Sequence, residues 1–255
     1  ASAASEVYKR QTSSDEVNIV ACQICYSMFR TPTKIARIRS GAYLNQNALF
    51  DKHHVPIDRL INPEQVVTEQ ITELLSHPGA LEVLDFADGR AQLVAMRAYL
   101  GGPLVGQALS FLSEHMPSVD TRVAAIFRRG QPIIPSGDTV IETDDEVFFI
   151  AAREHITAVM GELRKAEKPF RRVIIAGGGN IGARLAAATE NSYDVRIMEL
   201  NPQRAQTLAD QLNSAVVIQG SATDRELLLE ENIDQCDAFC AVTDDDEINI
   251  MSSLM

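Results

Sequence analysis

The residues with the clearest chemical purpose are six consecutive positions that could bind a phosphate group. They follow an apolar segment at 173–176 and open a stretch with helical spacing, the context in which G-x-G-x-x-G indicates a dinucleotide site. The first glycine would permit a tight turn, the third would let the backbone approach a pyrophosphate, and the last would let helix and strand pack closely. Free N–H groups at the positive end of the helix would hold the phosphates. The six residues are Gly177, Gly178, Gly179, Asn180, Ile181 and Gly182.

A carboxylate stands where a ribose would bind. Glu199 ends the next predicted strand, 22 residues after Gly177 (199 − 177). A carboxylate at this place accepts hydrogen bonds from the ribose hydroxyls and would repel a 2′-phosphate. The pattern therefore favours NAD or an adenosine nucleotide over NADP, and the alternative is a glycine turn that serves only packing.

Two later loops also follow predicted strands, at the edge of the sheet where ligands bind. Residues 220–224 could line the adenine side of the site, or could form a plain turn with a helix N-cap. Thr243 and Asp244 begin a second loop that holds three consecutive aspartates, which could bind a cation. More often such a cluster is a helix N-terminus favoured by its dipole, so we expect no metal site here.

From the glycine run onwards, the chain has no residue in an obvious proton-transfer position. All five histidines (His53, His54, His77, His115 and His155) precede the glycine run. A dehydrogenase needs an acid or a base beside the nicotinamide, usually from a separate substrate domain, and residues 80–165 show no apparent constellation for this role. We therefore expect no catalytic residues, and a nucleotide that acts as a ligand rather than a cosubstrate. An NAD-dependent oxidoreductase fragment is the alternative.

The four cysteines, Cys22, Cys25, Cys236 and Cys240, could form a zinc or redox site only if two distant pairs met. Cysteine serves more often as a small buried apolar residue, which is what we expect here.

The glycine run belongs to a regular alternation of strands and helices. Predicted strands cover 172–176, 194–200, 215–218 and 238–242, with helices at 180–190, 202–212 and from 246 onwards. Asn201 would cap the second helix, and Thr223 with Glu226 would form a capping box for the helix after the third strand. Parallel strands joined by crossover helices predict an α/β fold with a doubly wound, Rossmann-like sheet.

The chain contains a long-period repeat. Residues 243–250 match residues 12–19 at an offset of 231 (243 − 12), with five of eight positions identical. At the same offset, a glycine run equivalent to 177–182 would fall ahead of residue 1. We therefore expect a fragment with the tail of one nucleotide-binding domain and most of a second. In the first domain we predict a helix at 15–30, strands at 34–39 and 55–58, and a helix at 63–76 capped by Asn62.

Between the copies lies a module of a different kind. Strands are predicted at 81–86, 91–99, 121–128 and 146–152, with helices at 106–115 and 154–167. We therefore divide the chain into a foreign or disordered leader (1–11), the C-terminal part of a first Rossmann domain (12–78), a smaller α+β domain (79–167) and a truncated second Rossmann domain (168–255).

Composition excludes several classes of protein. The net charge of −12 argues against nucleic-acid binding, which depends on Lys and Arg. The longest apolar runs are far shorter than the roughly 18 residues of a membrane helix, and residues 1–10 lack the apolar core of a signal peptide. We expect a cytoplasmic protein that does not insert directly into a membrane.

These motifs, in this order, resemble the cytosolic regulatory subunits of bacterial Trk-type potassium uptake systems, members of the RCK/KTN class. The resemblance covers residues 12–255. It includes 173–182, Glu199, Gly220-x-Ala-x-Asp224, 241–249 and 35–40, while 102–106 and 137–147 resemble the family's C-terminal subdomain. Ser221 departs from the acidic residue that is common in the family.

The resemblance implies tandem Rossmann (RCK N) domains, with an RCK C domain between the two copies. It implies a homo-oligomeric ring, peripheral at the inner face of the cell membrane, under a potassium-translocating membrane protein. NAD(H) and ATP or ADP would bind as regulatory ligands and gate the pore. A ring scaffold with a purely structural nucleotide is a further alternative.

Carried over by residue, the resemblance assigns the phosphates to 177–182 and the ribose to Glu199. Thr243 and Asp244 would line the crevice. Thr12, Ser13 and Arg37 would be the surviving side of the first site, although Arg37 could also be an ordinary charged residue on a strand.

Overall fold

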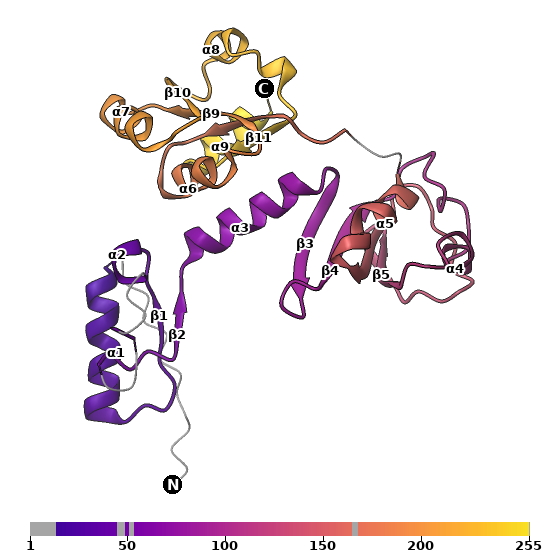
Figure 1. The fold of residues 1–255 in the computed structure, drawn as a ribbon, viewed down its shortest axis with the longest axis horizontal. Coiled ribbons are helices and arrows are strands. Elements are labelled where there is room, and N and C mark those ends of the chain that lie inside the picture. Colours follow the sequence, from indigo (N-terminus) through magenta and orange to yellow (C-terminus); the bar gives the residue numbers. More distant parts are fainter. Residues whose placement is uncertain (1–13, 45–48, 51–53, 165–167, 255) are drawn as a thin grey trace. The chain divides into compact units, whose positions relative to one another are not determined.

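The computed structural model describes residues 14–44, 49–50, 54–164 and 168–254. The chain divides into two compact units, Ala1–Thr68 and Glu69–Met255, with the division inside helix α3 (Pro63–Ser76) (Figure 1). Each unit is described by itself. The predicted leader at 1–11 and two of the predicted site residues, Thr12 and Ser13, lie outside the described residues.

The first unit is built around helix α1 and a pair of short parallel strands. Helix α1 (Asp15–Phe29) is capped by Ser14, and α2 (Gly41–Leu44) is a single turn. Strand β1 (Ile35–Arg37) pairs in parallel with β2 (Arg59–Ile61). Buried Ala36, Ile38 and Ile57 form the small core beneath them.

The prediction of a strand at 55–58 was wrong, since the strand is 59–61 instead. Pro56 has no N–H to give to a ladder, and Asp58 is held by residue 34. The Asp58 carboxylate accepts a hydrogen bond from the Lys34 backbone N–H at 2.7 Å. The backbone N–H of Asp58 in turn donates to the Lys34 carbonyl at 3.0 Å. The ladder therefore begins one residue later, and the strand predicted at 34–39 shortens to Ile35–Arg37.

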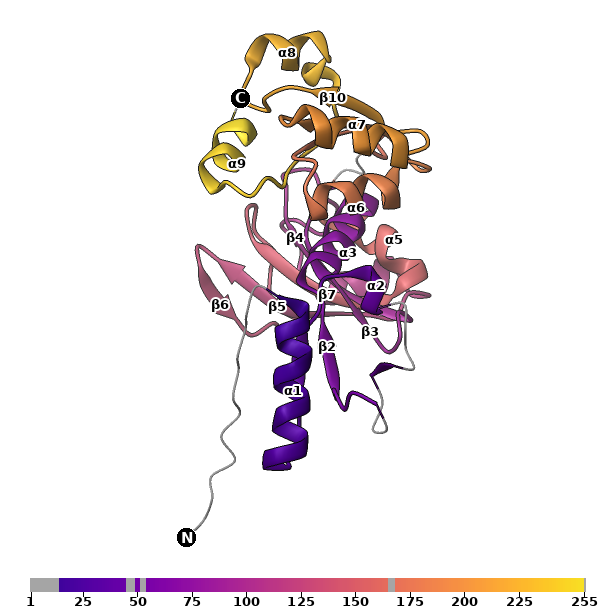
Figure 2. The ribbon, with the colours of Figure 1, turned by 90° about the vertical axis from the view of Figure 1, so that its left-hand side faces the viewer.

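In the second unit, the middle module is an antiparallel sheet. Its strands are β3 (Ala80–Phe86), β4 (Ala91–Arg97), β5 (Thr121–Arg128), β6 (Gln131–Ile133) and β7 (Glu146–Ala152), in the order β3-β4-β7-β5-β6. Helix α4 (Ser110–His115), a 3-10 turn (η2, Arg153–His155) and α5 (Ile156–Leu163) complete it. Its core is formed by buried apolar side chains that include Met96, Ile126, Val147 and Phe149. Figure 2 shows β6 at the margin of this sheet.

Both helix predictions in this module were partly wrong. The helix predicted at 106–115 begins only at Ser110. Gly106 has a φ of +86°, and Val105 and Ala108 form bridges to Ile141 and Val140, so the backbone is committed to strand-like pairing. The helix predicted at 154–167 starts as the η2 turn and ends at Leu163, while 165–167 lie outside the described residues. Strand β6 was not predicted.

The remaining residues form a four-stranded parallel sheet in the order β10-β9-β8-β11. The strands are β8 (Arg172–Ala176), β9 (Asp194–Glu199), β10 (Val216–Gln219) and β11 (Ala238–Ala241). The helices are α6 (Asn180–Thr189), α7 (Pro202–Gln211), α8 (Arg225–Glu230) and α9 (Asp246–Ser253), with a 3-10 turn (η3) at Ile233–Gln235. The predicted Rossmann-like fold is confirmed.

Helices cover both faces of this sheet, as a doubly wound fold requires. Leu185 of α6 and Leu208 of α7 pack on Val173 and Ile197, whereas Leu228 of α8 packs on the opposite face. Figure 1 accordingly shows α6 and α8 on opposite sides of the strands. Leu75, near the end of α3, is 4% exposed and belongs to the same core as Leu185.

The capping box predicted with Thr223 was wrong. The cap of α8 is Asp224, whose carboxylate accepts hydrogen bonds from the N–H groups of Glu226 and Leu227 at 3.0 and 3.3 Å. The cap predicted at Asn201 is confirmed, with its side chain accepting from the Arg204 N–H at 3.0 Å. The Asn62 cap is also confirmed, through the Gln65 N–H at 3.1 Å.

Candidate functional site

The turn after β8 can be made only by glycine. Gly177 has a φ of +107°, which residues with a Cβ rarely adopt, and an added Cβ would lie 2.9 Å from the backbone nitrogen of Thr243. The Gly177 N–H donates to the Met198 carbonyl at 2.9 Å. The tight turn from β8 into α6 therefore lies between β9 on one side and the loop after β11 on the other.

The three other glycines of the run meet different surroundings. A Cβ on Gly182 would collide with the Gly177 carbonyl oxygen, which explains why the helix can approach the strand so closely only with glycine here. A Cβ on Gly178 would collide with the Leu208 side chain. A Cβ on Gly179 would meet no atom within 4 Å. Gly179 is thus the one glycine of the run that faces open space.

Helix α6 begins without a capping side chain. Its N-cap is Gly179, no side chain bonds to its first turn, and Asn180 and Ile181 are its first residues. The Ala183 N–H donates to the Gly179 carbonyl at 3.0 Å. The N–H groups ahead of Ala183 therefore present donors at the positive end of the helix, which is the arrangement that binds anions.

Glu199 is joined directly to this loop. One carboxylate oxygen accepts a hydrogen bond from the Gly178 N–H at 3.0 Å, and the other accepts from the Asn201 N–H at 2.7 Å. The side chain predicted to bind a ribose therefore lies beside the phosphate loop. The geometry of the carboxylate is set by backbone donors on both sides.

Arg204 completes the loop and was missed by sequence reasoning. Its Nε–H donates to the Gly178 carbonyl at 2.9 Å, from the first turn of α7. This places a permanent positive charge next to residues proposed to meet phosphates. The signal that could have revealed it is a basic residue two positions after Pro202, on the helix that follows the Glu199 strand.

Thr243 and Asp244 lie at the end of β11, next to Gly177. The N–H and the hydroxyl of Thr243 both donate to the Asn249 side-chain oxygen, at 2.9 and 2.8 Å. The Asn249 amide donates back to the Thr243 carbonyl at 3.1 Å. This ring of bonds fixes the loop, while Asp244 is exposed.

The aspartate that follows Asp244 acts as a helix cap. The Asp245 carboxylate accepts from the Ile248 N–H at 3.0 Å and so begins α9. Within the described part of the chain, no group of three or more His, Cys, Asp or Glu side chains could hold a metal ion. The 220–224 loop is likewise a turn, in which Ser221 Oγ accepts from the Thr223 N–H at 3.2 Å before Asp224 caps α8.

The first unit repeats part of this geometry. Ser14 caps α1 through the Val17 N–H at 3.3 Å, and its partner in the repeat, Asp245, caps α9. Asn18, the counterpart of Asn249, is buried and donates to the Arg37 carbonyl at 3.0 Å. The sequence repeat therefore corresponds to a matching helix start in each unit.

Arg37 belongs to the first unit, and its guanidinium lies 3.6 Å from Glu64. Its Nε is buried and bonds to no described residue. The structure thus shows a partly paired arginine on a strand, and Thr12 and Ser13, predicted beside it, are outside the described residues.

Three of the four cysteines have a raised pKa. All four are free thiols. Burial raises the pKa of Cys22 and of Cys236, and it raises the pKa of Cys240 to about 11. A raised pKa keeps a thiol protonated, which is the opposite of what a metal ligand or nucleophile needs.

Among the described residues, no helix has the length and apolar character needed to cross a lipid bilayer.

Two domain families match the chain. The TrkA-N domain matches residues 173–255, which include the glycine run, and the TrkA-C domain matches residues 93–164, most of the antiparallel module.

Curated relatives match nearly the whole chain. "Trk system potassium uptake protein TrkA" of Halomonas elongata is 63% identical over 244 residues, which are 96% of this chain and 53% of the relative. The protein of the same description from Vibrio alginolyticus is 55% identical over 245 residues, 96% of this chain and 54% of the relative. The chain spans about half the length of the curated relatives it matches.

Solved structures share the fold. The crystal structure of the GsuK RCK domain aligns with a TM-score of 0.63 at 19% identity, covering 94% of this chain and 50% of that one. The GsuK channel bound to NAD aligns with a TM-score of 0.61 at 19% identity, covering 94% of this chain and 41% of that one.

Proposed function

Since the chain belongs to the TrkA family of RCK proteins, we propose that it is a nucleotide-binding part of a regulatory subunit that gates a potassium-translocating membrane protein. The relatives are named for potassium uptake, and the chain corresponds to about half of their length. We also propose the domain boundaries expected from the sequence: the C-terminal part of a first Rossmann domain (12–78), an RCK C domain (79–167) and part of a second Rossmann domain (168–255).

The observation that carries this proposal is the open space in front of Gly179. In the same loop, side chains at 177, 178 and 182 would meet protein atoms, but a side chain at 179 would meet none. Gly179 is also the N-cap of α6, and no side chain caps this helix start. A phosphate group has the charge and the acceptor oxygens to bind such a start.

The class of ligand follows from the Glu199 carboxylate. The Glu199 carboxylate can accept from ribose hydroxyls and would repel a 2′-phosphate, so NAD(H) is favoured over NADP(H). ATP and ADP carry the same ribose and phosphates. The fold neighbour described as bound to NAD makes NAD(H) the first ligand to test.

Regulation requires that the nucleotide bind two states of the assembly with unequal affinity, because a ligand with equal affinity for both shifts nothing. We propose that the chain assembles as a homo-oligomeric ring at the cytoplasmic face of the membrane. The ring would transmit the change of shape to the potassium-translocating subunit.

The decisive experiment compares nucleotide binding by the parent chain and by Gly179→Asp. Gly179 has a φ of −66° and open space, so the variant should fold normally while its carboxylate repels phosphate. The matched control is Gly161→Asp, on α5, where an added Cβ also meets no atom within 4 Å. Calorimetry should show that NAD(H), ATP and ADP bind the parent and the control but not Gly179→Asp. Undiminished binding by Gly179→Asp would remove the site assignment.

A second measurement separates regulation from catalysis. Potassium flux through liposomes holding the translocating subunit should change when the nucleotide bound to the regulatory subunit changes. Unchanged flux with ATP, ADP and NADH would favour the scaffold alternative. Steady NADH oxidation with a carbonyl or imine substrate would favour the oxidoreductase alternative.

A further inference from the structure

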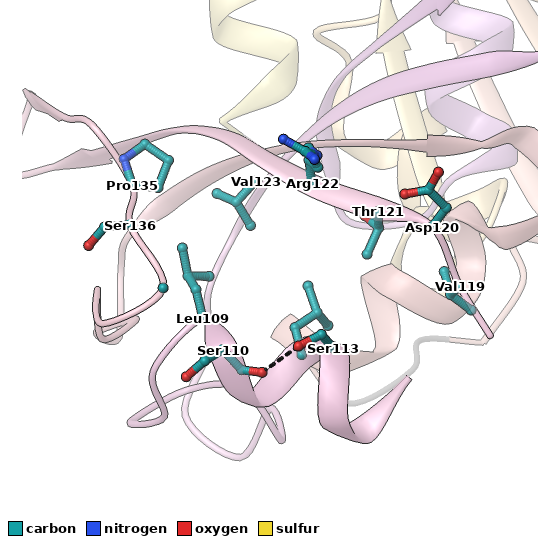
Figure 3. A pocket seen from close by; sticks show the side chains of 12 residues that line it. Leu109, Ser110, Ser113, Val119, Asp120, Thr121, Arg122, Val123, Pro135 and Ser136 are labelled. Carbon is teal, nitrogen blue, oxygen red and sulfur yellow. Dashed lines mark hydrogen bonds between the residues drawn. The ribbon is translucent and has the colours of Figure 1, made fainter. Parts of the chain in front are cut away.

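One half of strand β5 has no neighbour on its outer side. Strand β6 pairs only with Ile126, Phe127 and Arg128, so residues 121–125 face no strand of the described sheet. A pocket of about 520 Å³ lies beside them, bounded by Leu109, by Ser110, Leu112 and Ser113 of α4, and by the loop at 135–137 (Figure 3). An unpaired edge of this kind is a template for another strand.

The backbone groups that face this edge can be identified from the ladder. Pro132 has no N–H, so its pair with Phe127 cannot be a hydrogen-bonded one, and Ile126 and Arg128 bond to β6 instead. The irregularity between Val123 and Ala125 adds one residue and shifts the alternation. The N–H and C=O groups of Thr121 and Val123 therefore point outward, towards the unpaired side.

The side chains along the edge would match those of a second, antiparallel copy of the same segment in charge and character. They read Val119, Asp120, Thr121, Arg122, Val123. If two copies pair antiparallel about Thr121, valine faces valine, Asp120 of each copy faces Arg122 of the other, and threonine faces threonine. Residues directly opposite in an antiparallel pair share one face of the sheet, so both charge pairs can form.

The charges needed for this pairing are available. Asp120 and Arg122 are exposed and have no ion pair with any described residue, whereas Arg128 on the same strand is bound to Asp145 at 2.8 Å. In Figure 3, Asp120 and Arg122 project from one side of the strand, and Thr121 projects towards the pocket.

We propose that residues 119–123 pair with the same residues of a second copy of this chain, joining two five-stranded sheets about a twofold axis. Each copy would donate from the Thr121 N–H to the Thr121 carbonyl of the other, and from the Val123 N–H to the Val119 carbonyl. The Val119 N–H takes no part, because it already donates to the Met116 carbonyl at 3.1 Å. This contact adds a defined interface to the proposed ring and does not involve the nucleotide site.

The test uses charge reversal in the full chain. In Asp120→Arg, both charge pairs become arginine against arginine, and in Arg122→Asp both become aspartate against aspartate. Each variant should self-associate about tenfold or more weakly than the parent, since opposed charges across strands attract and like charges repel. An equimolar mixture of the two variants should associate as tightly as the parent, because every pair across the contact is again opposite in charge. The double variant Asp120→Arg with Arg122→Asp should also associate like the parent.

Analytical ultracentrifugation measures each dissociation constant, and thermal unfolding checks that each variant is folded. Glu82→Arg, an exposed position on β3 at the opposite edge of the sheet, and Arg129→Asp, in the β5–β6 turn, are the controls and should associate like the parent. Amide exchange should slow with rising protein concentration at Thr121 and Val123 and not at Arg122, whose N–H faces β7.

A mixture that associates no better than either variant alone would overturn the proposal. The proposal would also be overturned if the amides of Thr121 and Val123 were protected at high protein concentration but the charge-reversal variants associated like the parent. That result would indicate that another segment of the second copy pairs with this edge. Nucleotide binding measured on the same variants keeps the two proposals apart, because loss of this contact should leave binding at 177–182 unchanged.

Discussion

The Glu199 carboxylate accepts a hydrogen bond from the Gly178 N–H at 3.0 Å, which ties the end of β9 to the loop after β8. The same side chain accepts from the Asn201 N–H at 2.7 Å, at the cap of α7. Glu199 therefore stabilises the shape of the proposed phosphate loop as well as offering an acceptor to a ribose. Substitutions here should affect stability and ligand binding together.

Glu199→Gln should weaken NAD binding about tenfold and lower the free energy of unfolding by about 1–2 kcal/mol. Glutamine offers one oxygen where two backbone donors now meet two oxygens, and it brings an N–H₂ group towards a donor. Calorimetry and urea unfolding measure the two effects. Glu226→Gln, exposed on α8, is the control and should change neither quantity. Full NAD affinity in Glu199→Gln would exclude Glu199 from the ribose site.

Gly182→Ala and Gly179→Ala should behave in opposite ways. The methyl group at 182 would collide with the Gly177 carbonyl oxygen, so unfolding free energy should fall by about 1–3 kcal/mol. The methyl group at 179 enters open space at a φ of −66°, so stability should be retained while nucleotide affinity falls. Urea unfolding with and without NAD distinguishes them. Equal destabilisation by both would contradict the assigned geometry of the loop.

Leu75→Ala should lower the free energy of unfolding by about 2–5 kcal/mol, because Leu75 is 4% exposed within the core that includes Val173 and Leu185. Val66→Ala, an exposed position on the same helix, is the matched control and should cost far less. Denaturation in urea gives both values. A small effect at Leu75 would show that α3 does not contribute to the core of the parallel sheet.

Acid should remove a contribution of Glu190 to stability. The backbone N–H groups of Ser214 and Ala215 donate to its carboxylate at 2.7 and 3.0 Å and hold the pKa of Glu190 below its ordinary value. A folded-state pKa below the unfolded one gives stability that is present above the unfolded pKa of about 4.3 and is lost as pH falls through the folded-state pKa.

The measurement is the difference in unfolding free energy between the parent and Glu190→Gln. This difference should be largest near neutral pH and should shrink steadily below about pH 4. Glu226→Gln, without such backbone donors, should show no comparable trend. A difference that does not depend on pH would mean that the carboxylate charge is not what stabilises the loop at 213–215.

Local patterns predicted the elements well where a short apolar or alternating run has clear ends. Strands β5, β7 and β8 have the predicted bounds: burial alternates along β7, whereas β8 is a continuous buried apolar run after Arg172. The Asn201 cap was also predictable, because an amide before Pro202 is a local signal. The predictions failed at 55–58 and 106–109, where Lys34 and Ile141, distant in sequence, determine what the backbone bonds to.

The candidate site likewise has features that local sequence predicts and features that depend on distant contacts. The sequence by itself determined the glycine loop, the carboxylate at 199 and the two matching helix starts, because glycine spacing, strand ends and caps act over a few residues. Only the tertiary structure decided that Gly179 is the open position, that Arg204 reaches Gly178, and that the edge of β5 is unpaired. Those facts depend on which distant segments lie beside one another, and spacing along the chain carries no direct record of that.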